Sequence, residues 1–490
     1  MSSSITSRMA NATKWSAITE VLSKLVTPIS SMILARILAP EMFGVVASVN
    51  LVVSFCDVFS DAGFQKYIIQ HDSSGKKELD HVCNVAFWTN LVISLLIWFV
   101  IFLFANPLAK LVGSEGEGFA LVVACCNLPL HAFTSIQNAR LKRDMDFKKL
   151  FYIRAITIVV PFAVTIPLAI ITRSFWALII GTIAMNFAMV VAMFFIVRWN
   201  PRFDYSIATF KRIFGFSAWS LFESILVWVI NWGDTFVVGF LLSQYYLGLY
   251  KTGMNIVNQI VGVVSATLTP VLLSALSRTK DDDEDFKEIF YNTSFYTGVL
   301  LFPMGIGMFV YRELMCKIAL GSAWLEAATL MGIWGLISAI AILFNSYNGS
   351  VLIAKGKPKI SVIIQLSQIA VIIPVVYFTA KMDFEVLSYA RALVRIVGMF
   401  LHSIIVWKMF RLSAAKTLSK LAPVIMSSLL MGAAGFVFVR YSTSIAVELA
   451  SIFACCLIYL LLLMIFPSTR RLIFENVRKI LKKLPFKKKS

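Results

Sequence analysis

The sequence predicts an all-α integral membrane protein with about 14 transmembrane helices. Of its 490 residues, 59% are hydrophobic and only 14% are charged, and the mean hydropathy is +0.81. This composition is typical of polytopic membrane proteins and unlike that of a soluble domain. The apolar residues also gather in segments of about 20 residues, the length that a helix needs to cross a bilayer.

The predicted spans follow one another along the whole chain. The connections between them do not exceed roughly 20 residues, so we expect no separate soluble domain. The spans are predicted near residues 14–35, 43–66, 82–105, 119–140, 151–172, 175–198, 212–234, 246–276, 288–311, 324–348, 358–380, 385–409, 418–439 and 443–466.

The basic residues predict the orientation of the chain. An even number of spans puts both termini on one side of the membrane, and the positive-inside rule identifies that side. With the N-terminus in the cytoplasm, 34 of the 45 lysines and arginines fall on the cytoplasmic side and 8 on the outer side. Topology therefore explains the net charge of +19, and we expect no nucleic-acid partner.

One stretch recurs in the two halves of the chain. Residues 34–47 (LARILAPEMFGVVA) align without gaps on residues 238–251 (VGFLLSQYYLGLYK), which places Gly44 on Gly248. Internal duplication of this kind is typical of secondary transporters, whose substrate site lies between the repeats near the middle of the membrane.

A second similarity follows the fourth span of each half, where residues 137–138 correspond to residues 347–348 ahead of a basic turn. Together the similarities predict two six-helix lobes and a C-terminal helix pair. The predicted division is an N-terminal lobe (1–205), a C-terminal lobe (206–412), helices 13 and 14 (413–467) and a basic tail (468–490).

Three polar features outside the spans have simple interpretations. The tail alternates basic and apolar residues, which predicts an amphipathic helix on the anionic inner leaflet. The acidic run at 281–285 lacks the glycine and spaced ligands of a calcium loop, so we expect a solvated turn. The seven cysteines form no C-x-x-C pair, and we expect neither disulfides nor a metal site.

Charged residues inside the predicted spans are candidates for function. Inserting a charged side chain into the hydrocarbon layer costs at least ~2.5 kcal/mol of free energy on insertion scales. Each such residue is therefore expected to have a structural or functional role. In the first two spans, Glu20 and Lys24 are four residues apart and share a helix face, and so are Asp57 and Asp61. Other such residues are Glu223 in the seventh span and Arg391 and Arg395 in the twelfth.

A series of short motifs resembles that of a known family in order and spacing. The motifs are residues 13–18 (TKWSAI), 34–38 with 43–44, 59–64 (FSDAGF) with 69–70, 143–149 (RDMDFKK), 247–250 (LGLY), 321–324 (GSAW) and 354–356 (AKG). The chain resembles the Wzx-type lipid-linked oligosaccharide flippases of the multidrug/oligosaccharidyl-lipid/polysaccharide (MOP) exporter superfamily. Within them it is most similar to the branch around the colanic acid flippase WzxC.

The resemblance implies a fold and a function. Such proteins have two six-helix lobes that face each other in a V, as in MATE transporters, and two further C-terminal helices. They move undecaprenyl-diphosphate-linked glycans from the cytoplasmic to the periplasmic leaflet by alternating access, for O-antigen, capsule or exopolysaccharide. We therefore expect a bacterial inner-membrane protein that works beside the polysaccharide polymerase machinery and needs no cofactor beyond a coupling proton or sodium ion.

A diphosphate must be met by cations as it crosses the membrane. The candidate substrate-binding residues are Lys24, Arg36, Arg391 and Arg395. Each has a structural alternative. Lys24 can pair with Glu20, Arg36 can cap the outer end of the first helix, and the arginine pair can lie at the interface if the twelfth helix starts later.

Intramembrane carboxylates are the usual carriers of ion coupling. The candidates are Glu20, Asp57, Asp61 and Glu223, of which Glu223 is preferred because we expect it in the middle of the seventh span. For Asp61 the alternative is a structural role at a helix break.

Three other polar residues in apolar segments are assigned structural roles. Asp234 is expected to cap the end of the seventh span. His131 and His402 are each single histidines in apolar helices, and we expect them to be core residues with satisfied hydrogen bonds.

Rival functions remain open at this point. A multidrug exporter of the same superfamily would share the fold but would need fewer buried cations. A membrane glycan polymerase or ligase would carry a large outer loop with Arg or His, whereas the outer loops here are short, so we expect no enzyme. A scaffold would not need buried charge. No G-x-x-x-x-G-K-[ST] motif is present.

Overall fold

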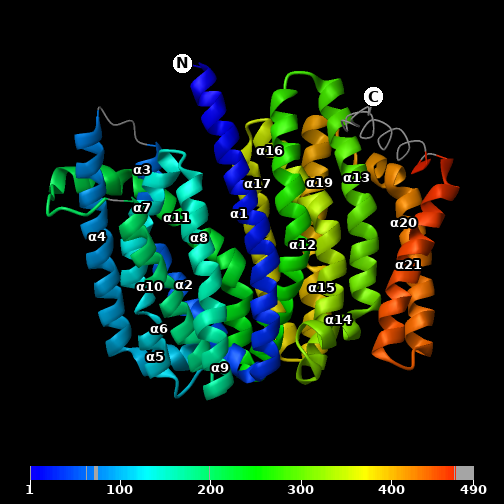
Figure 1. Ribbon diagram of the computed structural model, residues 1–490. Coiled ribbons are helices and arrows are strands. Elements are labelled where there is room, and N and C mark those ends of the chain that lie inside the picture. The colour runs from blue at the N-terminus through cyan, green and yellow to red at the C-terminus, as the bar shows by residue number, and fades with distance from the viewer. Residues whose placement is uncertain (1, 62, 71–74, 198, 468, 471–490) are drawn as a thin grey trace, which may run out of the picture. The chain divides into compact units, whose positions relative to one another are not determined.

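The computed structural model describes residues 2–61, 63–70, 75–197, 199–467 and 469–470 (Figure 1). Its helices are α1 (Ser2–Ile37), α2 (Pro40–Asp61), α3 (Phe64–Gln70), α4 (Lys76–Leu103), α5 (Ala105–Leu111), α6 (Gly118–Ala124), α7 (Asn127–Arg143), α8 (Phe147–Val160), α9 (Ile166–Thr172), α10 (Trp176–Val197), α11 (Ile207–Leu241), α12 (Gln244–Arg278), α13 (Asp283–Val310), α14 (Arg312–Ala319), α15 (Ala328–Ala341), α16 (Tyr347–Ala354), α17 (Pro358–Ala380), α18 (Phe384–Leu393), α19 (Arg395–Phe410), α20 (Ala414–Tyr441) and α21 (Ile445–Ile465). Three short helical turns join them, η1 (Pro161–Thr165), η2 (Ser322–Ala327) and η3 (Ile342–Ser346).

The predicted all-α membrane fold is confirmed. Fourteen helical segments of the described chain are long and apolar enough to cross a membrane, and each overlaps one of the fourteen predicted spans. The described residues contain no β-strand. Several spans consist of consecutive helices; the tenth, Ser322–Ala354, combines η2, α15, η3 and α16.

The second span ends earlier than predicted. Helix α2 stops at Asp61, and Gly63 adopts a positive φ of 79° before α3 begins. A Cβ at position 63 would lie 2.7 Å from the Cβ of Ser220, so the close approach of α11 also favours glycine here. The prediction that Asp61 lies inside a continuous span is therefore wrong, because it is the last residue of α2.

The helix of the seventh span extends beyond the predicted range at both ends. The side chain of Ser206 accepts a hydrogen bond from the backbone N–H of Thr209, which fixes the start of α11. The helix runs from Ile207 to Leu241, so Glu223 lies in its middle, as predicted. Asp234 lies well inside the helix, and the prediction that it caps the end is wrong.

The sequence repeat has a structural counterpart. Helix α1 ends at Ile37 and α2 begins at Pro40, whereas α11 ends at Leu241 and α12 begins at Gln244. Both the ends and the beginnings are 204 residues apart, from 37 to 241 and from 40 to 244. The predicted alignment of Gly44 with Gly248 uses the same shift, and the structure confirms it.

The basic turn also recurs, with the register moved by one residue. The N–H of Asp146 donates to the carbonyl of Leu141, and the N–H of Lys357 donates to that of Leu352. This shift of 211 residues places Gln137 opposite Asn348, not opposite residue 347 as the sequence alignment has it. The residue just before the end of each turn, Met145 or Gly356, has a positive φ, as the reversal at the end of a helix requires.

The helices form two compact units. The first contains Met1–Gln259, Ala319–Trp324 and Ile369–Leu387, and the second contains Ile260–Ile318, Leu325–Gln368 and Ser388–Ser490. The predicted lobes at 1–205 and 206–412 rest on the repeat and not on compactness, and they stay predictions. The predicted amphipathic tail lies outside the described residues apart from positions 469–470.

In the first unit, α2 is the central helix. It packs against α4, α6, α7 and α11, while α1 packs on α8 and α9 (Figure 1). Buried side chains of α2 such as Val49 and Val53 join Leu121 and Leu128 of the fourth span in one apolar cluster. The polar residues of α2 that follow this cluster are thereby held against α4 and α7.

In the second unit the tenth span forms the core. In the apolar 18-residue stretch of the tenth span, Ser322–Ala354, 83% of the residues are buried. The corresponding value for the last span, Ile445–Ile465, is 11%. Helix α15 crosses α13 closely because small residues meet there: a Cβ on Gly305 would lie 3.0 Å from the Cβ of Ala339. Helices α20 and α21 lie side by side against α13, as Figure 1 shows.

The acidic run caps a helix. The side chain of Asp282 accepts hydrogen bonds from the N–H groups of Glu284 and Asp285, and α13 starts at Asp283. Carboxylates in a first helical turn also favour the positive end of the helix dipole. The predicted solvated turn therefore has a definite structural use.

Candidate functional site: a polar cavity within the membrane helices

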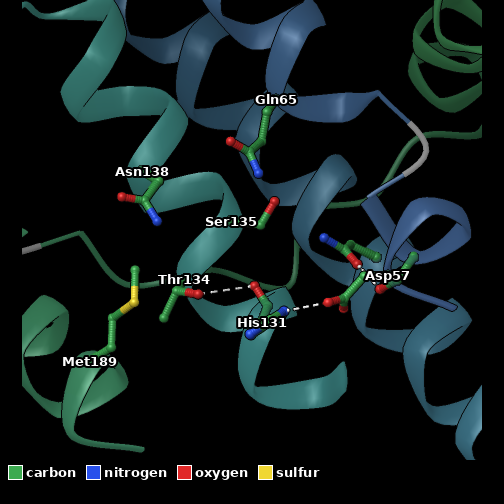
Figure 2. A pocket seen from close by; sticks show the side chains of 9 residues that line it. Asp57, Gln65, His131, Thr134, Ser135, Asn138 and Met189 are labelled. Carbon is green, nitrogen blue, oxygen red and sulfur yellow. Dashed lines mark hydrogen bonds and ion pairs between the residues drawn. The ribbon is translucent and has the colours of Figure 1, made fainter. Parts of the chain in front are cut away.

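A cavity of about 300 Å³ lies among the membrane helices of the first unit. It is roomy enough for several water molecules, whose share of liquid volume is about 30 Å³ each. Its lining is polar except for one methionine, and Figure 2 shows most of these side chains around the same space. The lining residues are Asp57 and Ser60 of α2, Gln65 of α3, Asn90 of α4, His131, Thr134, Ser135 and Asn138 of α7, and Met189 of α10.

An acid–base pair lies in this cavity. The Nδ1 atom of His131 is 2.9 Å from Oδ2 of Asp57, and the two side chains point toward one another (Figure 2). The side chains are 40% and 29% exposed, so both reach the cavity. Carboxylate and imidazole together can hold one proton between them and exchange it with water.

Buried polar groups hold the carboxylate side of the cavity. The hydroxyl of Ser60 donates to Oδ1 of Asn90 at 2.8 Å and also contacts the hydroxyl of Ser94. All three side chains are almost completely buried. Because polar groups in an apolar interior lose free energy unless they are hydrogen bonded, this network fixes α2 against α4 beside Asp57.

On the side of the cavity where His131 lies, two asparagine side chains are hydrogen bonded in series. The side chain of Asn186 on α10 lies beside His131. Its Nδ2 group donates to Oδ1 of Asn127 at 2.8 Å, and Asn127 in turn donates to the carbonyl of Ala124. The imidazole is therefore oriented between an amide and a carboxylate, which is how functional histidines are commonly held.

The predicted cationic residues of the first span lie outside this cavity. Lys24 Nζ is 3.7 Å from Oε1 of Glu20, so the pairing that the sequence allowed is present. Both side chains are partly exposed, and such a pair contributes little to stability. Arg36 lies in the last turn of α1 and is exposed. Both its substrate-binding role and the capping alternative stay predictions.

The preferred ion-coupling candidate has a basic partner. Oε2 of Glu223 lies 2.8 Å from Nζ of Lys66, which comes from α3. The side chains are 53% and 48% exposed. Of the other carboxylate candidates, Asp57 lines the cavity, whereas the side chain of Asp61 lies outside the described part of the chain.

The predicted arginine pair lies within the twelfth span, Phe384–Phe410. The guanidinium carbons of Arg391 and Arg395 lie 4.9 Å and 4.4 Å from the ring centroid of Trp334, and Arg395 donates to Ser338. Arg391 is only 6% exposed. The two residues share one face, as predicted, and they do not sit at the end of the span.

Two further polar residues are satisfied inside the helices. Asp234 is 4% exposed; its carboxylate accepts hydrogen bonds from the hydroxyl of Tyr250 and from the N–H of Thr235. His402 is buried, and its Nδ1 lies 3.0 Å from the carbonyl of Gly398, which confirms the prediction of a core histidine. In the described part of the chain no three His, Cys, Asp or Glu side chains gather to form a metal site.

The polar face of α7 was not among the sites predicted from the sequence. His131, Thr134, Ser135 and Asn138 occupy positions i, i+3, i+4 and i+7 and therefore lie on one side of the helix. That spacing was visible in the sequence as a polar stripe in an apolar segment. The single histidine was instead assigned to the core, because its partner is 74 residues away in the chain.

Comparison with known proteins agrees with this architecture. Residues 33–329 match the family described as "Polysaccharide biosynthesis protein". The chain belongs to this family. The match covers more than half of the chain and includes every residue that lines the cavity.

Curated relatives carry related names. An "Uncharacterized membrane protein in cps region" of Klebsiella pneumoniae is 24% identical over 75% of this chain and 76% of that protein. The "Succinoglycan biosynthesis transport protein ExoT" of Rhizobium meliloti is 28% identical over 63% of this chain and 62% of that protein. The "Lipopolysaccharide biosynthesis protein WzxC" of Escherichia coli is 22% identical over 77% and 76%. The predicted resemblance is confirmed.

Solved structures share the fold. "Lipid II flippase MurJ, inward closed conformation" superposes with a TM-score of 0.75 over 93% of this chain and 99% of that chain, at 15% identity. An inward-facing multidrug resistance MATE transporter of the MOP superfamily gives 0.60 over 82% and 99%, at 13% identity. The family member described here therefore has the MOP superfamily fold, as predicted.

Proposed function

We propose that this protein is a flippase for lipid-linked oligosaccharides. It carries undecaprenyl-diphosphate-linked units from the cytoplasmic to the periplasmic leaflet by alternating access, for the synthesis of a surface polysaccharide such as O-antigen, capsule or exopolysaccharide. The family description, the relatives named as transport proteins and the fold shared with a lipid flippase support this proposal. On this view the chain transports and does not catalyse a reaction.

The observation that carries the proposal is the arginine pair inside the twelfth span. Arg391 and Arg395 lie in a membrane-spanning segment, where a charged side chain raises the free energy of insertion. Such residues are expected to serve a function. Two guanidinium groups on one face match a diphosphate, because each can donate two parallel hydrogen bonds to phosphate oxygens. In the conformation described here the ring of Trp334 contacts both guanidinium groups. A bound diphosphate would take the place of the ring at these groups.

A multidrug exporter of the same superfamily is the second candidate. The MATE structure is similar to this chain in fold alone, and such an exporter would share the carboxylates. It would have less use for Arg391 and Arg395, since many of its substrates would not carry a diphosphate. The arginine pair therefore favours the flippase.

The proposed membrane and orientation follow from charge. The protein is a multi-pass membrane protein. The excess of basic residues on one side supports the proposal that both termini lie in the cytoplasm, at a bacterial inner membrane. The basic tail would lie on anionic lipids of the inner leaflet. A polysaccharide polymerase on the outer side would take up the translocated unit.

The flippase proposal is tested by substituting the arginine pair. The variants Arg391→Ala, Arg395→Ala and the double variant are expressed in a strain that lacks this protein, and surface polysaccharide is measured beside the amount of protein in the membrane. We expect surface polysaccharide to fall and lipid-linked units to accumulate in the cytoplasmic leaflet. Full export by the double variant would show that the two arginines do not form the substrate-binding site.

Matched controls separate charge from folding. Arg440→Ala removes an exposed arginine from the last turn of α20 and should leave export unchanged. Arg391→Lys and Arg395→Lys keep the charge but lose the planar fork, so they should retain part of the activity. If the arginine variants instead export polysaccharide normally, and loss of the protein lowers drug resistance, the exporter becomes the better description.

The energy source is proposed to be an ion gradient. The sequence has no P-loop of its own. Of the carboxylates named from the sequence, Asp57 is the one that the structure places in a polar cavity, whereas Glu20 and Glu223 are partly exposed and paired with lysines. We therefore propose Asp57 as the carboxylate that couples ion movement to transport.

A further inference from the structure

We propose that the coupling ion is a proton and that Asp57 and His131 bind it together. This inference rests on the proposed function, since it names the ion that drives the same transport. It goes beyond the sequence, which left proton and sodium equally open and assigned His131 to the core.

The geometry is that of a shared proton. Nδ1 of His131 faces Oδ2 of Asp57 at 2.9 Å, a normal distance for a charge-assisted hydrogen bond. Both side chains line a cavity that can hold water, so the proton has somewhere to go. His131 is twelve residues from Arg143 at the end of α7, which puts it about 18 Å along the helix from that end.

The pair is better suited to a proton than to sodium. Hard cations such as calcium and magnesium prefer shells of oxygen ligands, and the same preference for oxygen is expected of sodium. Here one carboxylate oxygen of Asp57 faces a ring nitrogen, and Ser60 and Asn90 are hydrogen bonded to each other. A sodium ion bound at Oδ2 of Asp57 would have to displace the imidazole from its partner.

The step is a simple proton release. In the loaded state the imidazolium N–H donates to the Asp57 carboxylate, and the pair has no net charge. On release the N–H bond breaks, its electron pair stays on nitrogen, and the proton moves to water in the cavity. The pair is left with one negative charge, which is costly among membrane helices and favours either a new proton or a change of conformation.

The surrounding charges leave the pair as the exchangeable site. On the helices packed against it, Arg140 of α7 is 2.5 Å from Asp80 of α4, and Lys66 of α3 pairs with Glu223 of α11. Neighbouring titratable groups are thiols, Cys56 beside Asp57 on α2, and Cys125 and Cys126 just before α7. Helix α10 presents the neutral Asn186 and Met189.

The site is tested first without any glycan. Purified full-length protein in detergent is titrated in unbuffered solution between about pH 8 and pH 5, where histidine exchanges its proton. We expect His131→Gln to take up about one proton fewer per chain than the wild type, and sodium chloride in place of potassium chloride to leave the count unchanged. An unaltered count, or a sodium-dependent loss of protons, would overturn the assignment.

Export in cells provides the second measurement. Asp57→Asn and His131→Gln should abolish surface polysaccharide at normal protein level. His402→Gln is the matched control, because it alters a membrane histidine that bonds only to its own helix in the described contacts. Full export by both cavity variants would also overturn the proton site.

The two measurements separate this inference from the proposed function. If the cavity variants export normally while the arginine double variant does not, the flippase stands and the proton site fails. If His131→Gln takes up one proton fewer than the wild type, but the wild type exports no lipid-linked glycan, the proton site stands and the flippase proposal fails. Thermal unfolding of each purified variant shows whether a loss of export comes from misfolding.

Discussion

The backbone at Gly44 lies directly against the carbonyl of Gln244. A Cβ placed on Gly44 would be 1.8 Å from that oxygen, and a Cβ placed on Gly248 would be 1.9 Å from the carbonyl oxygen of Pro40. Gly44 corresponds to Gly248 and Pro40 to Gln244 under the same shift of 204 residues. The first turns of α2 and α12 therefore meet in a nearly symmetric contact that glycine alone permits.

This contact predicts the effect of adding one methyl group. Gly44→Ala or Gly248→Ala should force the two helices apart and lower the free energy of unfolding by about 1–3 kcal/mol, the usual cost of overpacking. Thermal unfolding in detergent measures the change. Gly307→Ala is the control, since nothing lies near its Cβ and alanine is favoured in a helix. Equal melting temperatures for all three variants would contradict the contact.

Gln244 adds polar contacts to the same place. Its Nε2 group donates to the carbonyl of Gly113 and to the hydroxyl of Ser114 at 2.9 Å, and it lies 3.3 Å from the hydroxyl of Ser48. Gln244→Leu should cost about 1–3 kcal/mol, because a carbonyl loses its donor. If the proposed alternating access separates the helices here, a Ser48→Cys thiol should react faster with an impermeant maleimide when Gln244→Leu is present. Unchanged labelling would show that Gln244 does not hold this end closed.

The ion pair of Lys66 and Glu223 should contribute little to stability. Both side chains are about half exposed, and exposed pairs are typically worth about 0.2–1 kcal/mol. A double-mutant cycle with Lys66→Gln and Glu223→Gln, followed by unfolding, gives the coupling energy directly. A coupling of several kcal/mol would mean that the pair is shielded from water in the working protein.

Trp334 should support both arginines. Because the two guanidinium groups lie on one ring, Trp334→Leu removes two cation–π contacts, each worth about 0.5–2 kcal/mol. We expect lower thermal stability and weaker export than for Trp334→Phe, which keeps an aromatic face. If the leucine and phenylalanine variants behave alike, the ring acts through its volume and not through its π-system.

Much of the fold could be predicted from the sequence because membrane insertion depends on local properties. A segment of about 20 apolar residues must be helical in lipid, where every backbone group needs an internal partner. The fourteen spans and the pairing of Glu20 with Lys24 follow from neighbours in the chain. The repeat that aligns Gly44 with Gly248 follows from comparing the two halves of the sequence.

Helix bounds were less predictable where packing overrides hydropathy. The apolar run of the second span continues through residues 43–66, yet the chain breaks at Gly63, where α11 comes too close for a Cβ. The prediction for Asp234 was wrong because the helix of the seventh span continues to Leu241. Tertiary contacts set the limits of a helix more closely than its composition does.

The sequence by itself determined that this is a helical membrane protein with an internal repeat, and which charged residues it carries into the membrane. Only the tertiary structure decided which of those charges meet. Asp57 and His131 are 74 residues apart, and Lys66 and Glu223 are 157 apart. The physical reason is that hydropathy acts along one helix, whereas the partner of a polar side chain depends on how the faces of different helices pack.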